Sequence, residues 1–141
     1  MVENPKPSVL FVCVKNAGKS QMAAALMRKL AGDSVDIDSA GTKPGGSVNA
    51  LSVESLKEVG VDISAEAPKP IDPERVRDVD YVITLGREAH VTPVDGTAFE
   101  TWETDEPSDR GIDGIERMRL VRDDIANRVD DLFRRLTKDS A

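Results

Sequence analysis

The sequence has little of two residue types that many enzymes and binding proteins depend on. Among its 141 residues there is one cysteine, Cys13, and one histidine, His90. A single cysteine excludes an intramolecular disulfide, and a cysteine that stays reduced favours the cytoplasm. With one residue of each type, no Cys/His metal cluster can be assembled, so we predict no metal site.

Aromatic residues, positive charge and long apolar runs are also scarce. The chain has three phenylalanines, one tyrosine and one tryptophan, too few to indicate a stacking site for a base, and its net charge is −7. That charge argues against nucleic acid and anionic membranes as partners. No apolar run approaches the roughly 18 residues of a membrane span, and residues 1–7 lack the apolar segment of a secretory signal. We expect one cytoplasmic domain over residues 1–141, with flexible tails at 1–7 and 138–141.

In one stretch of the sequence, a strand pattern, a short loop and a helix pattern follow one another directly. Residues 8–20 read S-V-L-F-V-C-V-K-N-A-G-K-S. The run Val9–Val12 is typical of a strand buried on both faces, and apolar residues then recur at helical spacing from about Gly18 to Ala31. The loop between them therefore lies at a helix N-terminus, where free backbone N–H groups and the helix dipole attract an anion.

This loop, residues 13–20, is called the anion loop below. Lys15 and Lys19 add full positive charges to it, and the same field favours the thiolate form of Cys13, which we predict to be a nucleophile. Ser20 is predicted either to donate a hydrogen bond to that thiolate or only to satisfy the start of the helix. The residues predicted to bind an oxyanion are Val14, Lys15, Asn16, Ala17, Gly18 and Lys19.

Two other interpretations of the anion loop are open from its residues alone. Gly18-Lys19-Ser20 matches the end of the nucleotide-binding pattern G-x-x-x-x-G-K-[ST], but Cys13 stands where the first glycine belongs. No apolar strand ends in an aspartate suited to bind Mg²⁺, which argues against nucleotide binding. The second interpretation is that Cys13 is only a buried core residue, because free cysteine packs as a small hydrophobe.

The rest of the chain alternates between strand and helix patterns. Strands are predicted at residues 35–40, 81–85 and 98–102, and helices at 49–59, 72–77 and 118–136. This alternation predicts an α/β fold of three layers, with a parallel sheet and right-handed crossovers. In such a sheet, the loops that follow the third and fourth strands face the same side as Cys13.

The anion loop resembles the C-x5-R-[ST] loop of the low-molecular-weight protein tyrosine phosphatases and of the arsenate reductases built on the same fold. Lys19 stands at the arginine position, and Asn16 stands where that family has a loop-shaping asparagine. Residues 39–42, Ser-Ala-Gly-Thr, are similar to the segment that supports the loop in the family. The resemblance implies a doubly wound, four-stranded parallel sheet with strand order 2-1-3-4. Lys19 is a departure, because lysine cannot form the bidentate contact that arginine forms.

The family places an Asp-Pro pair after the last strand, and its aspartate is a general acid. In this sequence Glu106 separates Asp105 from Pro107. We therefore predict Asp105 as the catalytic acid, with Glu106 as its rival, while a solvated acidic loop stays open as the plain alternative. The catalytic residues implied by the resemblance are Cys13, Lys19, Ser20 and Asp105.

Thioredoxin-coupled arsenate reductases of this fold carry two further cysteines after the third strand, and residues 86–93 contain neither. The resemblance therefore implies the single-cysteine, arsenate-mycothiol transferase type. Arsenate would bind in the anion loop, pass to mycothiol or another low-molecular-weight thiol as co-substrate, and be reduced to arsenite by a mycoredoxin or a glutaredoxin-like redoxin, with no bound cofactor. The alternatives are a low-molecular-weight protein tyrosine phosphatase and a non-catalytic oxyanion-binding module.

Overall fold

The computed structural model describes residues 6–138 and contains a four-stranded, all-parallel sheet of order β2-β1-β3-β4. The strands are β1 (Ser8–Cys13), β2 (Asp36–Gly41), β3 (Tyr81–Leu85) and β4 (Ala98–Trp102). Every residue of β1 is buried, which explains the unbroken apolar run of its sequence. The predicted fold class and strand order are confirmed.

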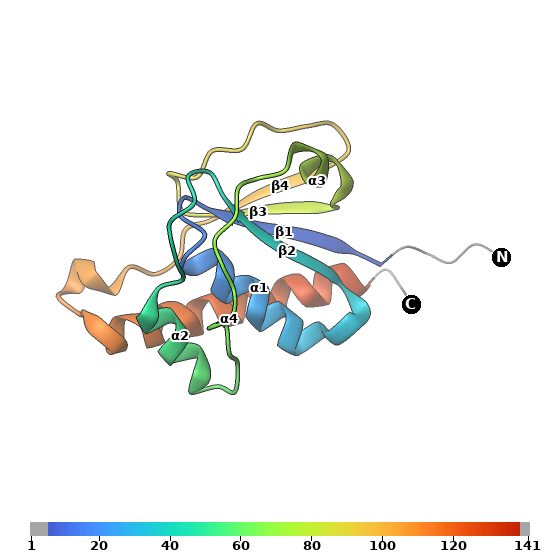
Figure 1. Cartoon of the computed structure of the whole chain (residues 1–141). Helices are drawn as coiled ribbons and strands as arrows, with labels where there is room; N and C mark the ends of the chain where they lie inside the picture. The colour runs from blue at the N-terminus through green and yellow to red at the C-terminus, as the bar shows by residue number, and fades with distance from the viewer. Residues whose placement is uncertain (1–5, 139–141) are drawn as a thin grey trace.

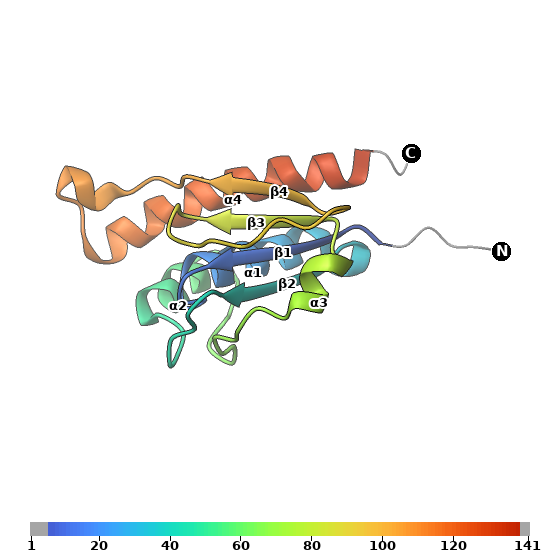
Figure 2. The same ribbon diagram turned by 90° about the horizontal axis from the view of Figure 1, so that it is seen from above.

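Helices cover both faces of the sheet, which gives the three predicted layers (Figures 1 and 2). Three helices lie on one face: α1 (Lys19–Ala31), α2 (Ala50–Lys57) and α4 (Gly114–Lys138). The short helix α3 (Pro73–Asp78) lies on the opposite face together with irregular chain. Two 3₁₀ turns complete the order, η1 (Gly32–Ser34) and η2 (Pro107–Arg110). No helix in the described range is long and apolar enough to cross a membrane.

The core is split by the sheet into two clusters. Because side chains alternate along a strand, Val9, Phe11 and Cys13 of β1 join the cluster under the larger helix layer, whereas Leu10 and Val12 join the cluster on the α3 side. Cys13 therefore ends β1 on the face that α1 covers.

Register places the end of β1 beside the end of β2. The pairs run from Ser8 with Asp36 to Cys13 with Gly41, and on the other side β1 pairs with β3 from Val9 to Val12. The loop after Cys13 and the loop after Gly41 consequently leave the sheet side by side at the same edge.

The predicted element boundaries need small corrections. The terminal helix begins at Gly114 rather than Met118, because Met118 is its first buried residue and the preceding turn carries no apolar period. Lys138 was predicted to lie in a flexible tail, but it belongs to α4. The other predicted tail residues at 1–5 and 139–141 lie outside the described residues, and Lys6 and Pro7 have no regular structure.

Candidate oxyanion site

The anion loop has its backbone carbonyls occupied by the segment that follows β2. Four backbone N–H groups of residues 42–49 donate to backbone carbonyl oxygens of the loop. The N–H to O pairs are Thr42 to Cys13 (3.1 Å), Lys43 to Val14 (2.8 Å), Gly45 to Lys15 (2.9 Å) and Asn49 to Ala17 (2.7 Å). The remaining two carbonyls also accept, Asn16 O from Gln21 Nε2 at 3.1 Å and Gly18 O from Met22 N–H at 2.9 Å. Every carbonyl from Cys13 to Gly18 therefore has a donor.

Three N–H groups of the same loop are left without protein acceptors. Within residues 6–138, the amides of Lys15, Ala17 and Gly18 donate to no protein atom. Free amide donors at the start of a helix form an anion-binding arrangement, because the helix dipole adds positive potential there. The loop therefore has free backbone donors of the kind that the predicted oxyanion site requires.

Gly41 allows this close packing of two loops. A Cβ atom at this position would lie 2.7 Å from Val14 O, 3.0 Å from Asn16 Cβ and 3.1 Å from Asn16 N. The first and last of these neighbours are backbone atoms, which cannot swing away as the end of a flexible side chain can. The glycine in the Ser-Ala-Gly-Thr segment is thus required by the shape of the anion loop.

Asn16 connects the parts of the loop. It is the one non-glycine residue in the described range with positive φ, at 53°, a conformation that asparagine tolerates better than most side chains. Its side-chain Oδ1 accepts from Gln21 Nε2 (3.2 Å) and from Lys69 N–H (3.1 Å), and its Nδ2 donates to Ser20 Oγ (2.7 Å). Asn16 is fully buried, so this orientation is fixed by protein groups.

Cys13 receives hydrogen bonds suited to a negatively charged sulfur. Asn16 N–H donates to Cys13 Sγ at 3.2 Å, and Ser20 Oγ lies 2.9 Å from the same sulfur. Because Asn16 Nδ2 already donates to Ser20 Oγ, the Ser20 hydroxyl hydrogen is free to point at the sulfur. Cys13 as a residue is 9% exposed, so it is nearly buried at the start of the loop.

Lys19 lies beside Glu106, from the loop that follows β4. Its Nζ is 4.0 Å from Glu106 Oε1, and Arg117 of α4 donates two hydrogen bonds to the same carboxylate, at 2.8 and 2.9 Å. The hydrogen bonds from Arg117 lower the pKa of Glu106, and this effect exceeds the rise that partial burial would cause. A hydrogen bond from Ser108 and the charges of Arg117 and Lys19 lower it further, so that the pKa of Glu106 is about 2. Glu106 is therefore ionised at neutral pH.

Asp105, the predicted general acid, has a different partner. Its carboxylate accepts from Arg110 Nη1 at 2.8 Å and Nη2 at 3.1 Å, and the hydrogen bond from Arg110 holds its pKa below the ordinary value. The structure thus brings Glu106, and not Asp105, to Lys19. Arginine partners favour the charged form of both carboxylates, and a charged carboxylate has no proton to donate. The catalytic role of Asp105 stays a prediction.

Two residues that support the site were not predicted from the sequence. Gln21, only 2% exposed, and Lys69 both donate to Asn16, yet Lys69 is separated from it by 53 positions. The one feature of the sequence that could have indicated such a role is the polar Gln21 on the predicted buried face of an amphipathic helix. Residues 6–138 contain no group of three His, Cys, Asp or Glu side chains placed to hold a metal ion.

Replacing Glu106 with glutamine should lower the melting temperature at about pH 7, because Arg117 loses its charged partner. The pKa of Glu106 falls from 4.5 to about 2 on folding, so its stabilising effect is complete above about pH 5 and is lost as the pH falls toward 2. The difference between variant and wild type should shrink over that range in thermal melts. Glu103→Gln, which removes the exposed ion pair with Arg87, is the control and should change little. Equal melting temperatures for Glu106→Gln and wild type at neutral pH would contradict the prediction.

Comparison with known proteins places this site in a family. The model of the low molecular weight phosphotyrosine protein phosphatases matches residues 8–141. An arsenate reductase of Halalkalibacterium halodurans is 36% identical over 130 residues, covering 88% of this chain and 93% of that protein. A glutaredoxin arsenate reductase of Synechocystis is 30% identical over 132 residues, covering 92% and 98%.

Solved structures agree with the sequence relatives. A thioredoxin-dependent arsenate reductase of Corynebacterium glutamicum superposes with a TM-score of 0.82 at 37% identity. The match covers 98% of this chain and 65% of that one, so the chain spans just under two thirds of its length. The predicted resemblance to arsenate reductases of this fold is confirmed, and the chain belongs to the low molecular weight phosphotyrosine protein phosphatase family.

Proposed function

We propose that this protein is an arsenate reductase that binds arsenate in the anion loop and uses Cys13 as its nucleophile. The observation that carries the proposal is the loop that begins at Cys13: the amides of Lys15, Ala17 and Gly18 have no protein acceptor, and the Cys13 sulfur lies within hydrogen-bond distance of Asn16 N–H and Ser20 Oγ. Arsenate and phosphate share charge and tetrahedral shape, so the loop fits either oxyanion. The names of the family relatives favour arsenate.

In the proposed reaction, the Cys13 thiolate forms a bond to arsenic while one arsenate oxygen takes up protons and leaves as water. The amides of the anion loop and Lys19 stabilise the negative charge of the remaining oxygens. A low-molecular-weight thiol then displaces Cys13 and carries the arsenic(V). Attack by a redoxin thiolate on the sulfur of that adduct forms a mixed disulfide, and the electron pair of the broken sulfur-arsenic bond reduces arsenic to arsenite.

The electrons must come from outside this chain, because Cys13 is its one cysteine and no second thiol can close an internal disulfide. We propose mycothiol as the first co-substrate and a mycoredoxin or glutaredoxin-like protein as the reductant, in the reducing environment of the cytoplasm. One relative is named for glutaredoxin and one structure for thioredoxin, which supports an external redoxin without choosing among them.

The competing function is hydrolysis of phosphotyrosine, for which the family is named. Lys19 in place of arginine disfavours it, because a single ammonium cannot bind two oxygens of a transferring phosphoryl group in parallel. Lys19 is also partly neutralised by Glu106, 4.0 Å away.

The experiment is arsenate-dependent NADPH oxidation with three separate reducing systems: mycothiol with its redoxin, glutathione with glutaredoxin, and thioredoxin alone. We expect turnover with a small-thiol system and none with thioredoxin alone. Sustained turnover with thioredoxin alone would refute the need for a small thiol. Hydrolysis of para-nitrophenyl phosphate without arsenate turnover would favour the phosphatase, and silence in both assays would favour a binding module.

A further inference from the structure

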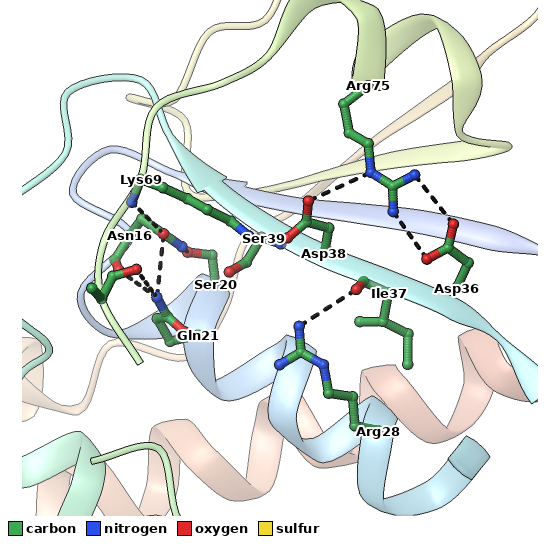
Figure 3. Close-up of polar contacts among 11 residues, drawn as sticks. Asn16, Ser20, Gln21, Arg28, Asp36, Ile37, Asp38, Ser39, Lys69 and Arg75 are labelled. Atoms are coloured by element: carbon green, nitrogen blue, oxygen red, sulfur yellow. Dashed lines mark hydrogen bonds and ion pairs between the residues drawn. The ribbon is translucent and has the colours of Figure 1, made fainter. Parts of the chain in front are cut away.

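Residues 67–70, which we name the strap, cross beside the anion loop without helical or strand structure of their own (Figure 3). Gly41 N–H donates to Lys69 O at 2.9 Å, and Pro70 forms an isolated parallel bridge with Gly41. Pro68 and Pro70 restrict the residues before them to extended conformations. Gln21 Nε2 also donates to Ala67 O of the strap at 3.3 Å. The strap is therefore a short, stiff segment held beside the anion loop by a small set of polar contacts.

The strap and Gln21 together determine which way the Asn16 amide points. Lys69 N–H and Gln21 Nε2 both donate to Asn16 Oδ1, at 3.1 and 3.2 Å (Figure 3). Since a primary amide accepts at its oxygen and donates at its nitrogen, two donors on the oxygen leave Nδ2 to face Ser20. That hydrogen bond in turn leaves the Ser20 hydroxyl hydrogen for Cys13. The two donors on Asn16 Oδ1, Lys69 N–H and Gln21 Nε2, thus set the direction of the hydrogen bonds that lead from Asn16 through Ser20 to Cys13.

The side chain of Lys69 fastens the strap to β2. It forms an ion pair with Asp38, whose carboxylate also lies 3.5 Å from Arg75 Nε. Burial alone would raise the pKa of Asp38, but hydrogen bonds from Lys69 and Ser39, with the charges of Lys69 and Arg75, hold it below the ordinary value. The Lys69 side chain is 51% exposed, and an ion pair at that exposure contributes little to global stability. Its effect should therefore be local to the strap.

We propose that Lys69 and Asp38 are positioning residues for the nucleophile. Their ion pair holds the strap where Lys69 N–H fixes the Asn16 amide, and Asn16 and Ser20 then present donors to the Cys13 sulfur. Neither residue contacts the sulfur, so both act through Asn16. The proposal rests on Cys13 being the nucleophile of the proposed function, but its test needs no arsenate.

The test measures the rate of Cys13 alkylation by iodoacetamide against pH, which mass spectrometry can follow because the chain has one cysteine. At about pH 7, Lys69→Met and Asp38→Asn should react roughly three- to tenfold more slowly than wild type, as expected when one net hydrogen bond is weakened. Lys69→Arg, which keeps the ion pair, should restore the rate.

Asp36→Asn is the matched control. Asp36 lies on β2 two residues before Asp38 and accepts two hydrogen bonds from Arg75, both at 3.1 Å, but it has no contact with Lys69 (Figure 3). This variant should react at the wild-type rate. Wild-type rates for Lys69→Met and Asp38→Asn, equal slowing by Asp36→Asn, or failure of Lys69→Arg to restore the rate would each overturn the proposal. If the expected pattern appears but wild type reduces no arsenate, the proposed function fails and the positioning role stands.

Discussion

Replacing Cys13 with serine should abolish arsenate reduction, with a fall of at least about a thousandfold in turnover. The serine hydroxyl is not ionised at neutral pH, and the neighbours of the sulfur, Asn16 N–H and the Ser20 hydroxyl, provide no strong base to activate it. The substitution exchanges one atom in a nearly buried position, so the fold should persist. The measurement is NADPH oxidation in the reducing system that supports wild type.

The control for Cys13→Ser is oxyanion binding without chemistry. The free amides of Lys15, Ala17 and Gly18 are backbone groups and are unchanged in the variant. Phosphate or arsenate should therefore still raise its melting temperature, to an extent near that of wild type. A variant that keeps more than about a tenth of the wild-type turnover would show that the nucleophile lies elsewhere.

Replacing Gly41 with alanine should damage the site although the residue contacts no substrate. Its Cβ would lie 2.7 Å from Val14 O, so the backbone of the anion loop or of the loop after β2 must move. Overpacking of this kind costs about 1–3 kcal/mol of stability, and a displacement of about 1 Å at a reacting group costs about a hundredfold in rate. We expect kcat/KM for arsenate to fall by roughly that factor, with a lowered melting temperature.

Gly46→Ala is the matched control for Gly41→Ala. Gly46 belongs to the same loop after β2, and a Cβ there would meet no atom within 4 Å. Its φ is not in the positive range that disfavours other side chains. This variant should keep wild-type kcat/KM and melting temperature. Equal kinetics for Gly41→Ala and wild type would mean that the two loops are not packed as closely as the structure places them.

The position of the anion loop could be predicted because its signals are local. A buried strand, a short loop with cysteine and lysine, and a helical apolar period follow one another within residues 8–31, and each signal reflects backbone geometry of adjacent residues. The bounds of β3 and β4 were predicted correctly for the same reason. The start of α4 was not predicted correctly, because the residues of its first turn are not buried. A turn that faces solvent has no apolar residues at helical spacing to mark it.

The partners of the site residues could not be predicted in this way. Lys69 donates to Asn16 across 53 positions, and Arg117 selects Glu106 over the neighbouring Asp105 because α4 passes the loop after β4 at that point. Two adjacent carboxylates look alike in sequence, and their different partners follow from which helix packs against which loop. The resemblance to the family placed a carboxylate in this region but could not say which one would meet Lys19.

The sequence by itself determined that one cysteine ends a buried strand at a helix N-terminus, in an α/β domain. These features depend on neighbouring residues, whose periodicity and turn chemistry act over a few positions. Only the tertiary structure decided that Gly41 packs against the anion loop, that Lys69 of the strap donates to Asn16 and that Glu106 lies beside Lys19. Those contacts join segments that meet through strand pairing and helix packing, so the physical forces that select them act between residues distant in the chain.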